Sequence, residues 1–171
     1  MKKGYIHVYT GNGKGKTTAA LGLSVRAACA GLEVYIGQFL KGMDYSELKL
    51  PEYFSNITME QFGSDYFIEQ NPSEEDQKKA DIGFKKVEEI LLSDKYDLVI
   101  LDEILVAVSL GLVNSDELLN AIKNKNPKIE LVLTGRNASE EIIDIADLVT
   151  EMKEIKHYYQ KGVQARIGIE K

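Results

Sequence analysis

The sequence of 171 residues contains one cysteine, two histidines and no tryptophan. With Cys29 as the one thiol, no disulfide framework can form and no Cys/His cluster is available for zinc. This scarcity of cysteine favours a reducing, cytoplasmic setting. No histidine accompanies an acid and a nucleophile in a recognisable hydrolase motif either. Cys29 lies in a run of alanines, where we expect a helix with the thiol in its core.

Long hydrophobic runs and an excess of positive charge are also missing. No window reaches the roughly 20 apolar residues that a transmembrane helix needs, so we expect no membrane association. There are 21 Lys and Arg against 27 Asp and Glu, a formal net charge of −6. Because duplex binders take their affinity from clustered basic residues, this composition argues against nucleic acid as a partner. With 44% hydrophobic residues, the chain suits a single domain over residues 1–171.

The most informative stretch is Thr-Gly-Asn-Gly-Lys-Gly-Lys-Thr-Thr at residues 10–18. It follows an apolar run and opens a run of small residues, which indicates a strand, a glycine-rich loop and a helix. In such a loop the backbone N–H groups face a polyphosphate, Lys16 adds charge, and the Thr17 hydroxyl can bind Mg²⁺. The match to G-x-x-x-x-G-K-[ST] has one defect, because Thr10 stands where the first glycine is expected. The residues predicted to bind the nucleotide here are Gly11, Asn12, Gly13, Lys14, Gly15, Lys16, Thr17 and Thr18.

The rest of the chain alternates between strand and helix patterns. We expect strands at 5–9, 33–39, 57–62, 97–101, 129–133, 148–152 and 164–169. We expect helices at 16–30, 73–93, 104–110, 115–125 and 139–146, the second of them capped by Ser73. No other periodic element is visible between residues 43 and 72. This order predicts a three-layer α/β P-loop fold of the RecA-like kind, with a mainly parallel sheet flanked by helices.

Two acids follow the apolar run at 97–101. Asp102 and Glu103 are placed like a Walker B ending, in which a carboxylate completes the Mg²⁺ shell directly or through water. The alternative is a pair of acids that caps the helix at 104. Because Thr17 already indicates a metal site, we favour the metal role, with either acid as the nearer ligand. Lys16, Thr17 and Glu103 are the predicted catalytic residues.

Other polar residues lie at the predicted strand ends, where ligands bind in sheets of this kind. Gln38 and Lys41 follow one strand, and Arg136 follows another. Arg136 either reaches phosphate or sugar oxygens or is a surface arginine in a turn. Arg26, in the first helix, either extends to solvent or serves the nucleotide. Local sequence leaves both alternatives open.

Together these blocks resemble the ATP:corrinoid adenosyltransferases of the CobA/CobO/BtuR type over nearly the whole chain. The phosphate loop has that family's threonine in place of the first glycine. The resemblance also rests on Gln-Phe-Leu-Lys-Gly at 38–42, Leu-Asp-Glu at 101–103, Leu-Thr-Gly-Arg-Asn at 133–137, Lys-His at 156–157 and the segment 162–170. The loop alone is moderately specific, whereas the ordered set is highly specific.

The resemblance implies transfer of the 5′-deoxyadenosyl group of ATP to the cobalt of a reduced corrinoid, cob(I)alamin or cobyrinic acid a,c-diamide, with triphosphate as the leaving group. It implies Mg²⁺, or Mn²⁺ in its place, and a loop that grips ATP in the reverse of the usual orientation. For Arg26 and Arg136, it favours nucleotide binding over a surface position. It further implies a homodimer and a flavodoxin-like or flavin reductant. The alternatives are a P-loop small-molecule kinase and an ATP-dependent binding switch, although Gly11 stands where one group of switch ATPases has lysine.

The sequence departs from the family in its aromatic residues. Members use an aromatic surface to remove the lower axial ligand of cob(II)alamin, often with tryptophan in the segment that matches residues 65–69. This chain has no tryptophan. Tyr66 and Phe67 are the predicted substitutes, and the alternative is that they pack within the loop.

Overall fold

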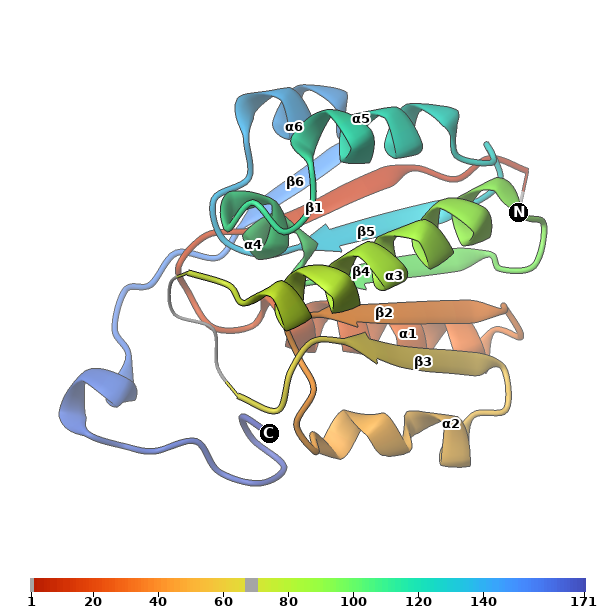
Figure 1. Cartoon of the computed structure of the whole chain (residues 1–171). Coiled ribbons are helices and arrows are strands. Elements are labelled where there is room, and N and C mark those ends of the chain that lie inside the picture. Colours follow the sequence, from red (N-terminus) through yellow and green to blue (C-terminus); the bar gives the residue numbers. More distant parts are fainter. Residues whose placement is uncertain (1, 67–70) are drawn as a thin grey trace.

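The computed structural model describes residues 2–66 and 71–171 (Figure 1). These residues form one six-stranded sheet in the order β3-β2-β4-β5-β1-β6, and all neighbouring strands are parallel. The strands are β1 (Ile6–Thr10), β2 (Val34–Phe39), β3 (Ile57–Phe62), β4 (Leu98–Asp102), β5 (Glu130–Thr134) and β6 (Leu148–Glu151). The helices are α1 (Lys16–Cys29), α2 (Leu50–Tyr53), α3 (Glu74–Leu92), α4 (Ile104–Ser109), α5 (Ser115–Asn124) and α6 (Glu140–Ile145), with 3-10 helices η1 (Ser46–Lys49) and η2 (Tyr158–Lys161). The predicted α/β fold is confirmed.

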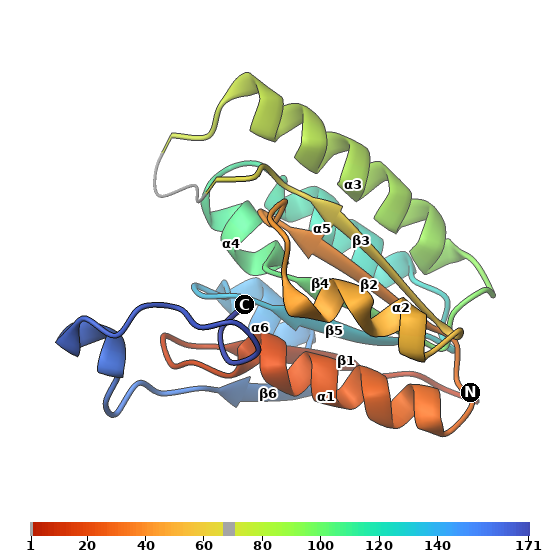
Figure 2. The same cartoon turned by 90° about the horizontal axis from the view of Figure 1, so that it is seen from below.

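Helices cover both faces of the sheet and give three layers (Figure 2). The core on one face includes residues of α3, α4, α5 and α6, and the core on the other face includes residues of α1 and α2. Strand β4 contributes to both, since Val99 and Leu101 point to the first core and Leu98 and Ile100 to the second. A strand buried on both faces has a continuous apolar sequence. For this reason β4 could be predicted from its sequence alone.

The order of the strands brings the predicted site together. Strand β1 leads into the phosphate loop, β4 ends at the acidic pair, and β5 lies between these two strands. Because all the strands are parallel, their carboxyl ends share one edge, which is where sheets of this kind bind ligands. One strand between the loop and the acids agrees with the predicted RecA-like arrangement.

The cap of α3 forms as predicted. The Ser73 hydroxyl accepts from the Asp76 backbone N–H at 3.2 Å, and the Asp76 carboxylate accepts from the Ser73 N–H at 2.9 Å. These two bonds satisfy N–H groups that the first turn of a helix leaves unpaired. Within the described part of the chain, no helix combines the length and apolar character needed to span a membrane.

Three expectations from the sequence are wrong. The predicted strand at 164–169 is absent from the described structure; the Arg166 guanidinium binds Glu170 at 3.1 Å and closes this segment into a turn. The thiol of Cys29 is exposed, because α1 buries a single stripe that includes Ala20, Ser24 and Ala27 and leaves Cys29 outside it. Residues 43–56, expected to lack periodic structure, form η1 and α2.

Candidate functional site

The phosphate loop is shaped by glycines and by the end of β6. Gly11 and Gly15 have φ of 95° and 124°, which favour glycine. The Gly13 N–H donates to the Met152 carbonyl at 2.6 Å, and a Cβ on Gly13 would lie 2.6 Å from that oxygen. Thr10 is still part of β1 and is extended there, so the first residue that needs glycine is Gly11. This explains the shifted glycine of the motif.

Lys16 begins α1 and is buried. Its ammonium donates to the carbonyl oxygens of Gly11 and Gly13, both at 2.8 Å. Burial lowers the pKa of Lys16, and the nearby charge of Glu103 opposes this effect. The ammonium therefore lies inside the loop with neutral partners, from which it can turn to a phosphate oxygen.

Asp102 is 1% exposed and accepts four hydrogen bonds. Its Oδ1 accepts from the hydroxyls of Thr17 at 2.9 Å and Thr134 at 2.7 Å. Its Oδ2 accepts from the Lys41 ammonium at 2.8 Å and from the Gln38 amide at 3.1 Å. Burial lowers the pKa of Lys41, but the charge and hydrogen bond of Asp102 together with the charges of Glu47 and Glu103 raise it above its ordinary value. Both oxygens of Asp102 are thus committed to protein groups.

Glu103 begins α4 in a left-handed conformation with φ of 58°. Its backbone N–H donates to the Thr134 hydroxyl at 3.0 Å, and its side chain lines the cavity described below. Burial raises the pKa of Glu103, Asp102 adds to this rise, and the charges of Lys41 and Lys16 oppose it. Of the two acids, Glu103 lines the cavity, whereas Asp102 is not among its described lining residues.

These residues suit a magnesium ion bound together with ATP. The Thr17 hydroxyl donates its hydrogen bond to Asp102, which leaves the lone pairs of the Thr17 oxygen for a cation, and Glu103 offers a carboxylate. The described residues contain no group of three or more His, Cys, Asp or Glu side chains that could hold a metal by itself. A cation here would depend on phosphate oxygens and water, as Mg²⁺ commonly does in nucleotide sites.

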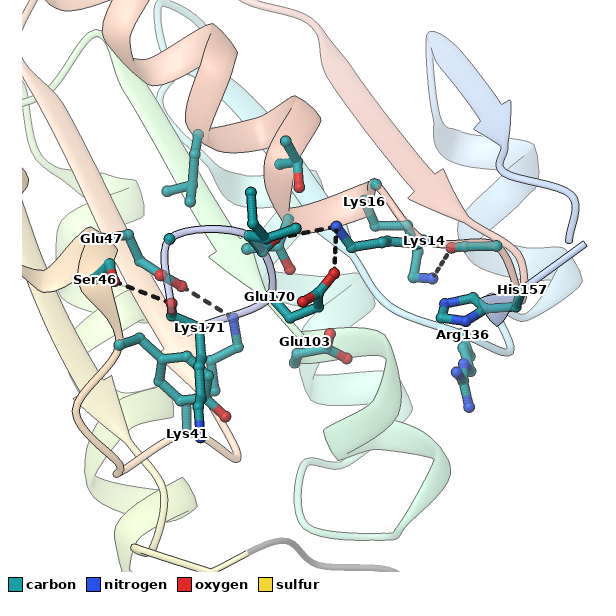
Figure 3. A pocket seen from close by; sticks show the side chains of 18 of the residues that line it. Lys14, Lys16, Lys41, Ser46, Glu47, Glu103, Arg136, His157, Glu170 and Lys171 are labelled. Carbon is teal, nitrogen blue, oxygen red and sulfur yellow. Dashed lines mark hydrogen bonds and ion pairs between the residues drawn. The ribbon is translucent and has the colours of Figure 1, made fainter. Parts of the chain in front are cut away.

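A cavity of about 750 Å³ lies over the loop (Figure 3). This volume is within the range of small-molecule sites. Its lining includes residues 12–18 and 45–47, together with Leu21, Lys41, Glu103, Arg136, His157 and residues 168–171. Arg136 enters from the turn after β5, where Gly135 has φ of 143° and a Cβ would lie 2.8 Å from the Cβ of Leu105. The loop, the acid and Arg136 therefore meet in one space.

Residues 157–171, here called the tail, form part of the cavity wall. They return along the carboxyl ends of the strands (Figure 1). The Lys14 ammonium donates to the Ile169 carbonyl at 3.0 Å and lies 3.4 Å from the Glu170 carboxylate. The Ser46 hydroxyl donates to the Lys171 carbonyl at 3.0 Å. Sequence reasoning missed this wall, although the resemblance at 162–170 was a signal for it.

Arg26 and Tyr66 lie apart from the cavity. Arg26 is exposed on α1, and neither residue is among the described residues that line the cavity. The Tyr66 hydroxyl donates to the Asp76 carboxylate at 2.8 Å, while 46% of its surface is exposed. Burial raises the pKa of Asp76, but hydrogen bonds from Ser64 and Ser73 outweigh it and lower that pKa to about 2. The predicted corrinoid contact Phe67 lies outside the described residues.

Comparison with known proteins gives consistent matches over the chain. A family model described as ATP:corrinoid adenosyltransferase BtuR/CobO/CobP matches residues 2–170. A corrinoid adenosyltransferase of Sinorhizobium sp. is 37% identical over 175 aligned positions, which cover 99% of this chain and 81% of that protein. A corrinoid adenosyltransferase of Escherichia coli K12 is 31% identical over 170 positions, with 99% and 86% covered. The corrinoid adenosyltransferase CobA of Salmonella typhimurium is 32% identical, with the same coverage.

Proposed function

Because this chain belongs to the ATP:corrinoid adenosyltransferase family BtuR/CobO/CobP, we propose that it transfers the 5′-deoxyadenosyl group of ATP to the cobalt of a reduced corrinoid. An electron pair of Co(I) forms the bond to C5′, and the bond from C5′ to oxygen breaks with its pair on the departing triphosphate. The substrate is itself the nucleophile, so the protein needs no general base. The observation that carries this proposal is the cavity in which Lys16, Thr17, Glu103 and Arg136 meet.

Lys16 and the loop amides stabilise the leaving group in this proposal. Charge develops on the bridging oxygen as the triphosphate departs, and fixed donors in a water-poor site stabilise such charge without reorganising. Lys16 is buried and bound only to neutral carbonyl groups, which phosphate oxygens can replace. Arg136, exposed at the cavity, supplies a second cation to the phosphates or the ribose. Arg26 stays a prediction.

Thr17 and Glu103 hold the Mg²⁺ that accompanies ATP, with Mn²⁺ as a substitute. When bound, the cation neutralises charge on the phosphates. Asp102 acts behind Thr17, because its four hydrogen bonds leave it no free position toward the cavity. Glu103 is therefore the acid that faces the ligand, and Asp102 orients the hydroxyl.

Tyr66 is the described residue that we propose to contact the corrinoid. The ring of Tyr66 is held through its hydroxyl by Asp76 and leaves part of its surface exposed. This fixed ring supports its proposed role beside Phe67 in removing the lower axial ligand. The preference for cobalamin or cobyrinic acid a,c-diamide, the flavin or flavodoxin-like reductant, the homodimer and the cytoplasmic location all stay predictions.

Corrinoid absorbance tests the proposal. The protein, ATP, Mg²⁺ and a chemically reduced corrinoid should together give the spectrum of an adenosylcorrinoid, and light should split its cobalt–carbon bond and give the spectrum of the Co(II) form. Omission of ATP should leave the reduced spectrum unchanged. Phosphorylation of a small molecule, or slow ATP hydrolysis that a protein partner stimulates, without any change in the corrinoid would favour the kinase or the switch. The comparisons give no support to either alternative.

A further inference from the structure

The turn after β2 holds Lys41 in a fixed place. Leu40, the residue before it, has φ of 60°, an uncommon conformation for a residue other than glycine. A Cβ on Gly63 would lie 2.3 Å from both the Leu40 carbonyl carbon and the Lys41 nitrogen, and one on Gly42 would lie 2.5 Å from the Gly63 carbonyl oxygen. Two backbones therefore pack directly against each other here. Strained backbone of this kind persists where the surrounding structure fixes it.

The ammonium of Lys41 lies at the cavity wall, between two carboxylates. It lies 2.8 Å from Asp102 Oδ2 and 3.5 Å from Glu47 Oε1, and its side chain is 14% exposed. It also lies 5.0 Å from the centre of the Tyr45 ring. Gln38, which is fully buried, donates to the same oxygen of Asp102. Lys41 and Gln38 together occupy Oδ2.

The other oxygen of Asp102 binds Thr17, which lines the cavity, and the buried Thr134. Oδ1 accepts hydrogen bonds from the hydroxyls of Thr17 and Thr134. The Thr134 oxygen in turn accepts a hydrogen bond from the backbone N–H of Glu103. A rotation of this carboxylate would therefore disturb both the Thr17 hydroxyl and the start of α4. The orientation of two cavity groups depends on what holds Oδ2.

We propose that Lys41 is a positioning residue, which holds Oδ2 of Asp102 so that Oδ1 accepts the hydrogen bond of the Thr17 hydroxyl and the lone pairs of the Thr17 oxygen face the cation that accompanies ATP. This inference rests on the proposed function, because it assumes that ATP binds in this cavity with a divalent cation. Side chains that orient a metal ligand typically change metal affinity 10- to 100-fold when removed. Lys41 also lines the cavity, so direct contact with phosphate is the competing explanation.

ATP binding without corrinoid separates these explanations, because no turnover is needed. ATP affinity is measured with Mg²⁺ and with EDTA, and Mn²⁺ affinity is followed by electron paramagnetic resonance in the presence of ATP. Lys41→Met should weaken ATP binding about tenfold with Mg²⁺ and less than about twofold in EDTA, with a similar loss for Mn²⁺. Lys41→Arg should restore most of the affinity. Equal weakening of ATP binding with and without the cation would overturn positioning in favour of phosphate contact.

Gln38→Met is the decisive second variant. Gln38 is fully buried and is not among the described lining residues, so it has no access to phosphate. It should nevertheless show the same cation-specific loss. If Gln38→Met and Lys41→Met both bind Mg²⁺ and ATP like the wild type, the inference is wrong. Lys86→Met is the matched control, because Lys86 pairs with Glu60 of β3 outside the cavity.

Thermal unfolding checks that each variant is folded before binding is compared. Wild-type protein that fails to bind ATP, or binds it equally with and without Mg²⁺, would count against the proposed function itself. Wild-type binding that depends on Mg²⁺, together with variants that do not change this dependence, would count against the role of Lys41 alone.

Discussion

Two walls of the same cavity are built in opposite ways. One wall lies over the ends of β2, β4 and β5 and is backed by the buried Asp102, whose oxygens accept four side-chain donors, each within 3.1 Å. The tail forms the other wall with residues that are mostly exposed. Its contacts with the rest of the cavity lining include the bonds from Lys14 of the phosphate loop and Ser46 of η1. One wall is thus inside the protein, and the other lies on its surface.

The two walls differ in how firmly they are held before a ligand binds. A buried polar group costs free energy unless its partners are in place, so the hydrogen-bonded wall is set before any ligand arrives. Exposed ion pairs and single hydrogen bonds exchange readily with water, and segments held in this way open at low cost. We infer that the buried wall fixes the geometry for cation and phosphate, while the tail adjusts around the rest of the ligand.

The largest effect is expected from Lys16→Ala, which removes the one buried cation of the loop. Turnover should fall by roughly 10³-fold, since one preorganised donor commonly contributes 10²- to 10³-fold. The fold should remain, because the partners of Lys16 are backbone carbonyls that water can satisfy. Adenosylcorrinoid formation and circular dichroism provide the measurements. Activity close to wild type would remove Lys16 from the leaving-group role.

Asp102→Asn tests the buried wall. The amide offers one acceptor where the carboxylate offered two, and it removes the nearer of the two carboxylate charges beside the Lys41 ammonium. We expect the free energy of unfolding to fall by about 3–5 kcal/mol, as for other broken buried pairs. Denaturant titration measures this change. The matched tail variant Glu170→Gln should unfold like the wild type, and equal losses in the two variants would contradict the contrast between the walls.

Glu103→Gln tests which acid faces the cation. Burial raises the pKa of Glu103 above its ordinary value of 4.5, so Mg²⁺ affinity should fall as the pH drops through this raised pKa. The glutamine variant should bind Mg²⁺ weakly and without this pH dependence.

The raised pKa of Glu103 also affects stability. Since the folded state favours the protonated carboxyl of Glu103, the free energy of unfolding of the wild type should decline as pH rises through the same window. The variant should lack this decline. Titrations of Mg²⁺ and denaturant at several pH values check both; a wild-type pH profile in the variant would refute the assignment.

The smallest effect is expected in the tail. Ser46→Ala removes the hydroxyl that binds the Lys171 carbonyl, and its effect on ATP affinity should stay within about twofold, because one exposed hydrogen bond contributes little. Hydrogen exchange should show fast amides in residues 163–171 without ATP and slower exchange with it, whereas β4 should be protected in both states. Equal protection of β4 and the tail without ATP would contradict a loosely held tail.

The sheet could be predicted because hydrophobic pattern determines which face of a strand is buried. The predicted bounds of the apolar runs lie within a residue or so of β2 and β4. The tail shows the limit of this reasoning. Val163, Ala165, Ile167 and Ile169 alternate as in a strand, yet all four are exposed. An alternating pattern indicates a strand only when a core is present to cover one side, and local sequence does not show whether that core exists.

The site was predicted in composition and only partly in arrangement. The loop and Arg136 come together in one cavity as expected, but the sequence could not distinguish Asp102 from Glu103. That distinction depends on the left-handed turn at Glu103 and on donors from β2 and β5, which lie far away along the chain. From the sequence, Lys41 was a candidate site residue only because it follows the end of a predicted strand. Its partner became visible only when β2 and β4 were paired in the sheet.

In the proposed reaction the loop holds three phosphates together as one leaving group. Phosphorus nuclear magnetic resonance of a single turnover, with ATP, Mg²⁺ and reduced corrinoid, tests it directly. We expect one triphosphate for each adenosylcorrinoid formed. ADP with inorganic phosphate as the primary products, without a cobalt–carbon bond, would contradict it.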